Sequence, residues 1–150
     1  MKTENNTHEY YVSLETAKML KEAGFDWKCM KCYNHEVMFD MESDEIREQF
    51  PQHSSYDVLA PTLDVAQRWL REVKNCYVNV YVDCDSVEVF YTASYLFHNG
   101  DNYNASYIWE DTGMNNDVKH RRFRRFFDNY EEALEAGIKK ALEIILEKVE

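Results

Sequence analysis

Apolar and polar residues alternate with a period of two in the middle of the chain, which predicts two adjacent β-strands. A polar turn at residues 83–86 separates them. The hairpin is expected to pair Val82 with Val87 and Cys76 with Ala93, because this register sets apolar residues opposite one another on one face. The residues expected to be buried together on that face are Val78, Val80, Val82, Val87, Val89 and Tyr91.

Two segments in the first half of the chain carry apolar residues at helical spacing. Residues 13–24 begin with Ser13, whose hydroxyl suits the cap position, and end at Gly24, which can adopt the left-handed conformation of a helix end. Residues 60–73 begin with Thr62 in the same capping role. Both segments are therefore predicted to be helices.

A third and longer helix is predicted at the end of the chain, after a cap at Asp128 or Asn129. We expect its charged face to pair Glu135 with Lys139 four residues further on. Its apolar stripe consists of Tyr130, Leu134, Ile138, Ala141, Leu142, Ile145 and Val149.

The remaining segments predict short elements. Residues 27–41 are rich in aromatic, β-branched and sulfur-bearing side chains and contain neither Gly nor Pro, which favours one extended segment. A short helix is predicted within residues 43–50, a third strand at residues 103–110, and a fourth strand within residues 120–127.

The order of these elements predicts an α+β protein. We expect a single two-layer domain over residues 1–150, with three main helices over one face of an antiparallel meander of about four strands. Residues 1–10 are expected to form a flexible tail. Apolar residues make up 45% of the chain and aromatic residues 15%, a composition that favours a packed core over disorder.

The charge is strongly acidic, with a formal net value of −11, but it is uneven. An acidic body repels nucleic acid and anionic membranes, which argues against binding to either. The exception is a basic strip at residues 119–125. Its arginines either pair with the acids of the protein itself, which we favour, or contact a protein partner or a nucleic-acid phosphate; they are Arg121, Arg122, Arg124 and Arg125.

The stretch Cys29-x-x-Cys32 followed by His35 has the residue types of a metal site or a redox pair. In one extended strand, however, residues three apart lie about 10 Å from each other and point to opposite faces. No glycine is present to form a metal-binding turn, and Cys76 and Cys84 lie too far apart to complete a zinc site. We expect the cysteines to pack in the core, with a metal site or a redox pair as the alternatives, and we expect no cofactor.

No catalytic motif is present in the sequence. The five histidines fall in different segments, and there is no nucleophile elbow or phosphate-binding glycine loop. The sequence therefore favours a protein that is not an enzyme, with an enzyme whose residues converge only in the folded chain as a third hypothesis. No apolar run reaches about 18 residues, and the first residues lack an apolar signal segment, so an intracellular location is expected.

The segments "YVSLETAKMLKEAGFD", "APTLDVAQRWLREVK" and "YEEALEAGIKKALE" resemble parts of small uncharacterised proteins encoded in phages, prophages and mobile elements of Bacteroides-type gut bacteria. The resemblance implies a small accessory protein in the cytoplasm of a bacterial host. That family has no assigned activity and no site residues to transfer to this chain.

Two functions follow as hypotheses. The first is an accessory protein that binds a host or phage protein through an acidic, tyrosine-rich surface, since tyrosine provides a large contact area with a polar tip. The second is a nucleic-acid-linked role, either through the basic strip or through an acidic face that imitates DNA. A homodimer is compatible with both.

Overall fold

The computed structural model describes residues 10–40, 57–111 and 122–147, and its secondary structure confirms the predicted α+β class. The short helix predicted within residues 43–50 and the predicted tail before Tyr10 lie outside the described residues. The elements in chain order are α1 (Leu14–Glu22), β1 (Lys31–Asn34), β2 (Val37–Asp40), β3 (Asp57–Leu59), α3 (Leu63–Val73), β4 (Cys76–Cys84), β5 (Val89–Asn99), β6 (Asn102–Tyr107), β7 (Trp109–Asp111), β8 (Arg122–Arg124) and α4 (Tyr130–Glu147).

The described strands form three antiparallel sheets, in the orders β2-β1-β3, β4-β5-β6 and β7-β8. The predicted meander corresponds to β4, β5 and β6. The strand predicted at residues 103–110 is divided at Ile108, whose side chain is buried beside Ala93 and Ala133. The predicted fourth strand exists as β8, but it pairs with β7 in a separate small sheet.

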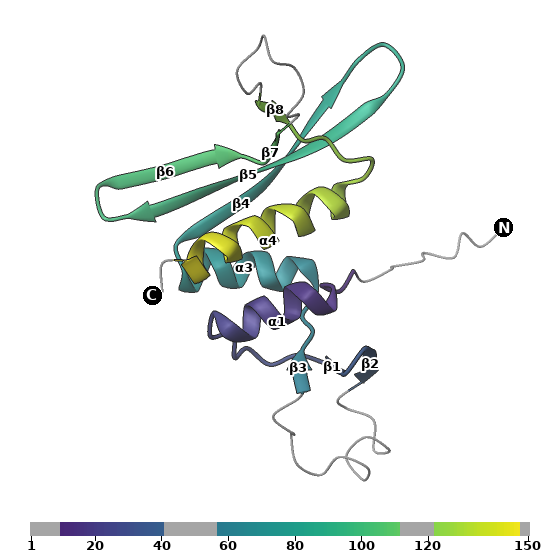
Figure 1. Ribbon diagram of the computed structural model, residues 1–150, viewed down its shortest axis with the longest axis vertical. Helices are drawn as coiled ribbons and strands as arrows, with labels where there is room; N and C mark the ends of the chain where they lie inside the picture. The colour runs from purple at the N-terminus through teal and green to yellow at the C-terminus, as the bar shows by residue number, and fades with distance from the viewer. Residues whose placement is uncertain (1–9, 41–56, 112–121, 148–150) are drawn as a thin grey trace, which may run out of the picture.

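The helices lie between the β4–β6 sheet and the small β1–β3 sheet (Figure 1). All three predicted helices and their caps are confirmed. The side chains of Ser13 and Thr62 each accept a hydrogen bond from a backbone N–H three residues later, at 3.3 Å. Asn129 accepts from the N–H of Glu132 at 2.8 Å, so it caps α4. Gly24 ends α1 with a φ of +97°.

The main core is formed where α3 and α4 meet the inner face of the β4–β6 sheet and where α1 packs against α4 and β3. Trp69 of α3 is almost fully buried, and its ring meets the ring of Phe25 edge to face at a centroid distance of 5.4 Å. Helix α4 approaches the sheet most closely at Gly137. A Cβ atom added there would lie 2.6 Å from a methyl group of Val78 and 3.0 Å from the Cβ of Ala93.

The predicted register of the β4–β5 hairpin is wrong by four residues. Val82 pairs with Tyr91 instead of Val87, and Cys76 pairs with Phe97 instead of Ala93. The turn has the predicted length but lies two residues further along the chain, at residues 85–88. There the side chain of Asp85 accepts hydrogen bonds from the N–H groups of residues 87 and 88, both at 2.7 Å. These bonds define a four-residue turn that alternation alone does not reveal.

The predicted burial of the hairpin is correct only near α4. Val78 is buried and Val80 is half-buried, but the residues nearer the tip are not. Val82, Val87 and Val89 are 61%, 85% and 52% exposed, because the hairpin extends past the end of α4 (Figure 1). The hairpin tip is therefore an exposed apolar surface.

Glu135 and Lys139 of α4 contact α1 and not each other. The carboxylate of Glu135 accepts hydrogen bonds from the N–H of Ser13 at 2.9 Å and from the hydroxyl of the buried Thr16 at 2.7 Å. Lys139 forms an ion pair with Glu15 at 2.8 Å. The predicted pair within α4 is thus replaced by contacts that fix α1 against α4.

Candidate functional site

The segment with Cys29, Cys32 and His35 forms a hairpin and not the single extended strand that the sequence predicts. His35 lies in the turn between β1 and β2 with a φ of 56°, a left-handed conformation that histidine adopts more readily than most residues. The turn therefore forms without glycine. Strand β1 is central in its sheet and pairs with both β2 and β3.

The two cysteines of this segment are buried to different degrees, and Cys29 packs against the main core. Cys32 is buried in β1, and Cys29 is half-buried, with its thiol donating to the carbonyl of Trp27 at 3.4 Å. Exposed His35 lies in the turn beyond them. Within the described residues, no three His, Cys, Asp or Glu side chains lie close enough together to hold a metal ion.

The surroundings of Cys29 predict a slowly reacting thiol. Burial raises the pKa of Cys29 to about 11, so its thiolate fraction at pH 8 is small. We expect iodoacetamide at pH 8 to label exposed Cys84 at least about tenfold faster than Cys29, with Cys32 and Cys76 labelled only on unfolding. Peptide mass spectrometry of timed samples measures this order. Equal rates at Cys29 and Cys84 would indicate an activated thiol and support the redox alternative.

The basic strip is only partly within the described residues. Arg121 lies outside them, and Arg122 and Arg124 belong to β8, where the backbone alone is described. The exposed Arg125 places its guanidinium over the ring of Phe127, 4.9 Å from the ring centroid. Its backbone N–H donates to Ile108 and its carbonyl accepts from the hydroxyl of Thr92, both at 2.9 Å. Backbone hydrogen bonds thus attach this segment to β5.

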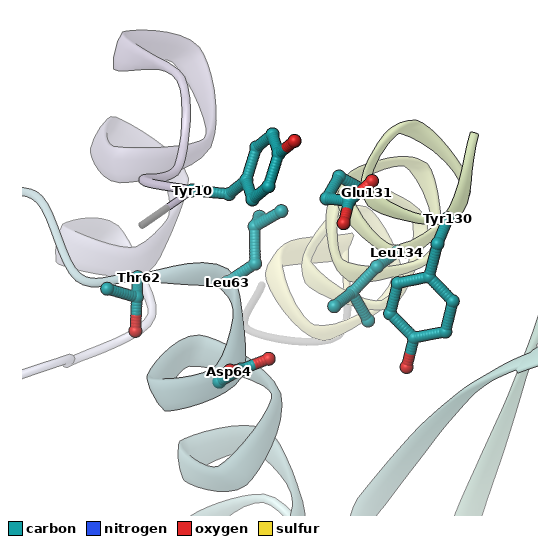
Figure 2. A pocket seen from close by; sticks show the side chains of 7 residues that line it. All are labelled: Tyr10, Thr62, Leu63, Asp64, Tyr130, Glu131 and Leu134. Atoms are coloured by element: carbon teal, nitrogen blue, oxygen red, sulfur yellow. The ribbon is translucent and has the colours of Figure 1, made fainter. Parts of the chain in front are cut away.

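One concave surface lies where α3 and α4 begin, and Figure 2 shows its lining. The pocket measures about 270 Å³, and a more open hollow of about 660 Å³ adjoins it and shares Tyr10, Leu63 and Glu131 with it. Asp64 and Glu131 supply carboxylates. The pocket is lined by Tyr10, Thr62, Leu63, Asp64, Tyr130, Glu131 and Leu134.

The polar groups of this pocket are few and have a structural explanation. Its lining includes no His, Cys or Lys, and its two carboxylates occupy the first turns of α3 and α4, where acids stabilise any helix. The combination of leucines and tyrosine rings can accommodate an apolar side chain. The shape and the apolar part of the lining therefore suit contact with a side chain of another molecule.

A second surface is the outer face of the β4–β6 sheet, opposite α4. The close contact of Gly137 with Val78 and Ala93 places α4 on the inner face, so the alternate residues of each strand point outward. We call this surface the tyrosine face. It consists of Tyr77, Asn79, Tyr81, Ser94, Leu96, His98, Tyr103, Ala105 and Tyr107.

The tyrosine face has aromatic walls around small residues. The rings of Tyr81 and Tyr107 meet at a centroid distance of 5.9 Å, and His98 stacks on Tyr103 at 4.7 Å. Beside the rings of Tyr81 and Tyr107, the small residues Ser94 and Ala105 line a hollow of about 360 Å³. Tyr77, Tyr81 and Tyr103 are exposed. Large amphipathic rings around a hollow are typical of surfaces that bind proteins.

The electrostatics of this region are acidic. Residues 75–118 contain no Lys or Arg, whereas the exposed hairpin tip carries Asp83, Asp85 and Glu88. Hydrogen bonds from the backbone N–H groups of Glu88 and Val87 lower the pKa of Asp85, so this carboxylate stays charged well below neutral pH. Arg125 lines the hollow beside α4, on the inner side of the sheet. The β4–β6 strands thus offer no cation to an anionic ligand.

Comparisons of the chain with protein family models, with curated proteins and with solved structures found no match. No described helix is both long enough and apolar enough to cross a membrane. The assignment of a function therefore rests on the geometry of the surfaces themselves.

The sequence contained a signal for the tyrosine face that the periodicity analysis did not use. In β4 the outward positions of the alternation carry Tyr77 and Tyr81, and in β6 they carry Tyr103 and Tyr107. Outward positions of a sheet open to water usually carry short polar or charged residues. Repeated tyrosine at such positions is therefore unusual for a face that is open to water.

Proposed function

We propose that this chain is a non-enzymatic accessory protein of a phage or mobile element that binds a basic segment of a partner protein on the tyrosine face. The observation that supports it is an open sheet face with four tyrosines and no cation. Arginine stacks on tyrosine rings, and Lys or Arg in the partner would complement Asp83 and its acidic neighbours.

The same observation argues against nucleic acid as the ligand of this face. Tyrosine faces of sheets can stack bases, but affinity for nucleic acid comes largely from Lys and Arg that contact phosphate. The strands of the tyrosine face provide none. A protein segment with Arg or Lys satisfies both the aromatic and the acidic features of the surface.

The test replaces Tyr81 and Tyr107 together with Ser. Removal of a central aromatic pair should weaken partner binding by about 30-fold, the effect of an interface hot spot of about 2 kcal/mol. The partner is first captured from a Bacteroides-type lysate on wild-type protein, identified by mass spectrometry and purified. Calorimetry then compares its affinity for wild type and variant at low and moderate salt.

The matched control replaces Tyr10 and Tyr130 with Ser, which removes two exposed tyrosines from the pocket at the helix ends. This control should bind the partner as wild type does. A partner lost only by the control variant would move the function to the helix-end pocket. Capture of nucleic acid instead of a protein by the wild-type chain would contradict the proposal. Equal affinity of the partner for both variants and for wild type would also contradict it.

A further inference from the structure

Strand β4 forms an edge of the β4–β5–β6 sheet. It has nine residues and contains neither Lys nor Pro, which many proteins use to block exposed edges. The backbone of every second residue points away from β5 in such a strand. The carbonyl of Val78 accepts a hydrogen bond from the side chain of Gln67 at 2.7 Å. The backbone N–H and carbonyl groups that point away from β5 are therefore those of the even-numbered residues.

Along this edge, the backbone groups at both ends already have hydrogen-bond partners, whereas those in the middle do not. Gln67 occupies the carbonyl of Val78 at one end, and Asp83 accepts from the N–H of Cys84 at 2.8 Å at the other. Among the described residues, the N–H groups of Val80 and Val82 that point away from β5 donate no hydrogen bond, and their carbonyl groups accept none. This leaves two donors and two acceptors in the arrangement that an added antiparallel or parallel strand requires.

The side chains around this open edge differ between the two faces of the sheet. Val82 is 61% exposed on the inner side, where the hairpin extends past α4 (Figure 1). Tyr81 is 47% exposed on the outer side and belongs to the tyrosine face. A strand added beside Val80 and Val82 would therefore place one row of its side chains next to Val82 and the other next to Tyr81.

We infer that the basic segment of the partner binds in extended form as an additional strand along β4, paired with Val80 and Val82. This inference rests on the proposed function and specifies how the partner is held. Its occupant follows from charge: Asp83, Asp85 and Glu88 lie at the end of the open edge, and no cation occurs in residues 75–118. Arg side chains on one face would reach the tyrosines, with small β-branched side chains next to Val82.

The first experiment uses an eight-residue synthetic peptide in which arginine alternates with threonine, and amide hydrogen exchange followed by NMR. Binding should slow exchange at the N–H groups of Val80 and Val82. The exchange rate of the Tyr81 N–H should change little, because this group already points toward β5. A peptide with glutamate in place of arginine should leave both rates unchanged.

The second experiment compares Val82→Pro with Val82→Thr. Proline is tolerated on an edge strand where its missing N–H would face solvent, and here it removes one donor of the open edge. The affinity for the arginine–threonine peptide should fall about tenfold in Val82→Pro and remain near wild type in Val82→Thr. A thermal melt of each variant verifies that it is folded, and the exchange experiment on wild type does not depend on either.

The outcomes separate this inference from the proposed function. Binding that is weakened by Tyr81→Ser but unaffected by Val82→Pro, without protection of Val80 and Val82, would overturn the added strand and retain the tyrosine face. If the peptide does not bind the wild-type protein at all, the inference that a basic segment binds along β4 is wrong. Protection of Val80 and Val82 in the absence of peptide, with a dimer in sedimentation, would assign the edge to a second copy and also overturn it.

Discussion

Replacement of Val80 with Asp should lower the free energy of unfolding by about 3 kcal/mol, since it removes an apolar contact and brings a charge against a packed face. Val80 is half-buried and touches both core clusters, one with Val78 and the other with Ala93. No Lys or Arg in β4 or β5 is available to pair with the new carboxylate. Urea denaturation followed by circular dichroism measures the change, and the melting temperature should fall by about 6–12 °C.

The control for this prediction is Val82→Asp, two residues further along the same face. Val82 is 61% exposed, so the same substitution there should change the free energy of unfolding by less than about 1 kcal/mol. The comparison tests how far along β4 the sheet is covered by α4. Equal destabilisation at both positions would show that the hairpin tip is covered, and a stable Val80→Asp variant would contradict the placement of Val80 in the core.

The β4–β5 hairpin shows which part of a register can be read from sequence. Alternation identifies the faces of both strands, and it does so correctly, because Val78, Val80 and Val82 share one face with Tyr91 and Ala93. It cannot distinguish registers that differ by an even number of residues, since each keeps every side chain on the same face. The turn makes that choice, and here the hydrogen bonds to Asp85 favour a turn two residues further along the chain than the one inferred from alternation.

The helices were more predictable because their signals are local. The caps at Ser13, Thr62 and Asn129 depend on residues within one turn, so their chemistry can be read directly from the sequence. Contacts between helices are different. Glu135 was expected to pair along α4, but buried Thr16 and the N–H of Ser13 are stronger competitors that only the folded arrangement brings near.

The candidate surface was predictable in character but not in position. Composition indicates an acidic, tyrosine-rich protein, but it does not show which tyrosines share a face. Pairing of β5 with both β4 and β6 brings Tyr81 and Tyr107 together from strands well separated in the chain. The turn at His35 was missed for a related reason, since a left-handed residue other than glycine has only a weak sequence signal.

Substitution of Gly137 with Val should destabilise the protein by about 3 kcal/mol or more, through overpacking between α4 and the sheet. Even a single added Cβ would lie 2.6 Å from a methyl group of Val78 and 3.0 Å from the Cβ of Ala93. Val78 is stiff and Ala93 is fixed to its strand, so neither can move aside without shifting the backbone. Urea denaturation should show a lower midpoint with an unchanged dependence on urea concentration.

Two further variants separate this contact from the general cost of valine in a helix. Ala136→Val, one residue earlier and half-buried, should cost only about 0.5–1 kcal/mol, because a Cβ atom is already accommodated at that position. Val78→Ala removes the methyl group nearest to Gly137, so the double variant Gly137→Val with Val78→Ala should be less destabilised than the sum of the single variants by at least about 1 kcal/mol. Strict additivity would show that the two residues do not touch, and it would contradict the packing of α4 on β4 that leaves the tyrosine face open on the other side of the sheet.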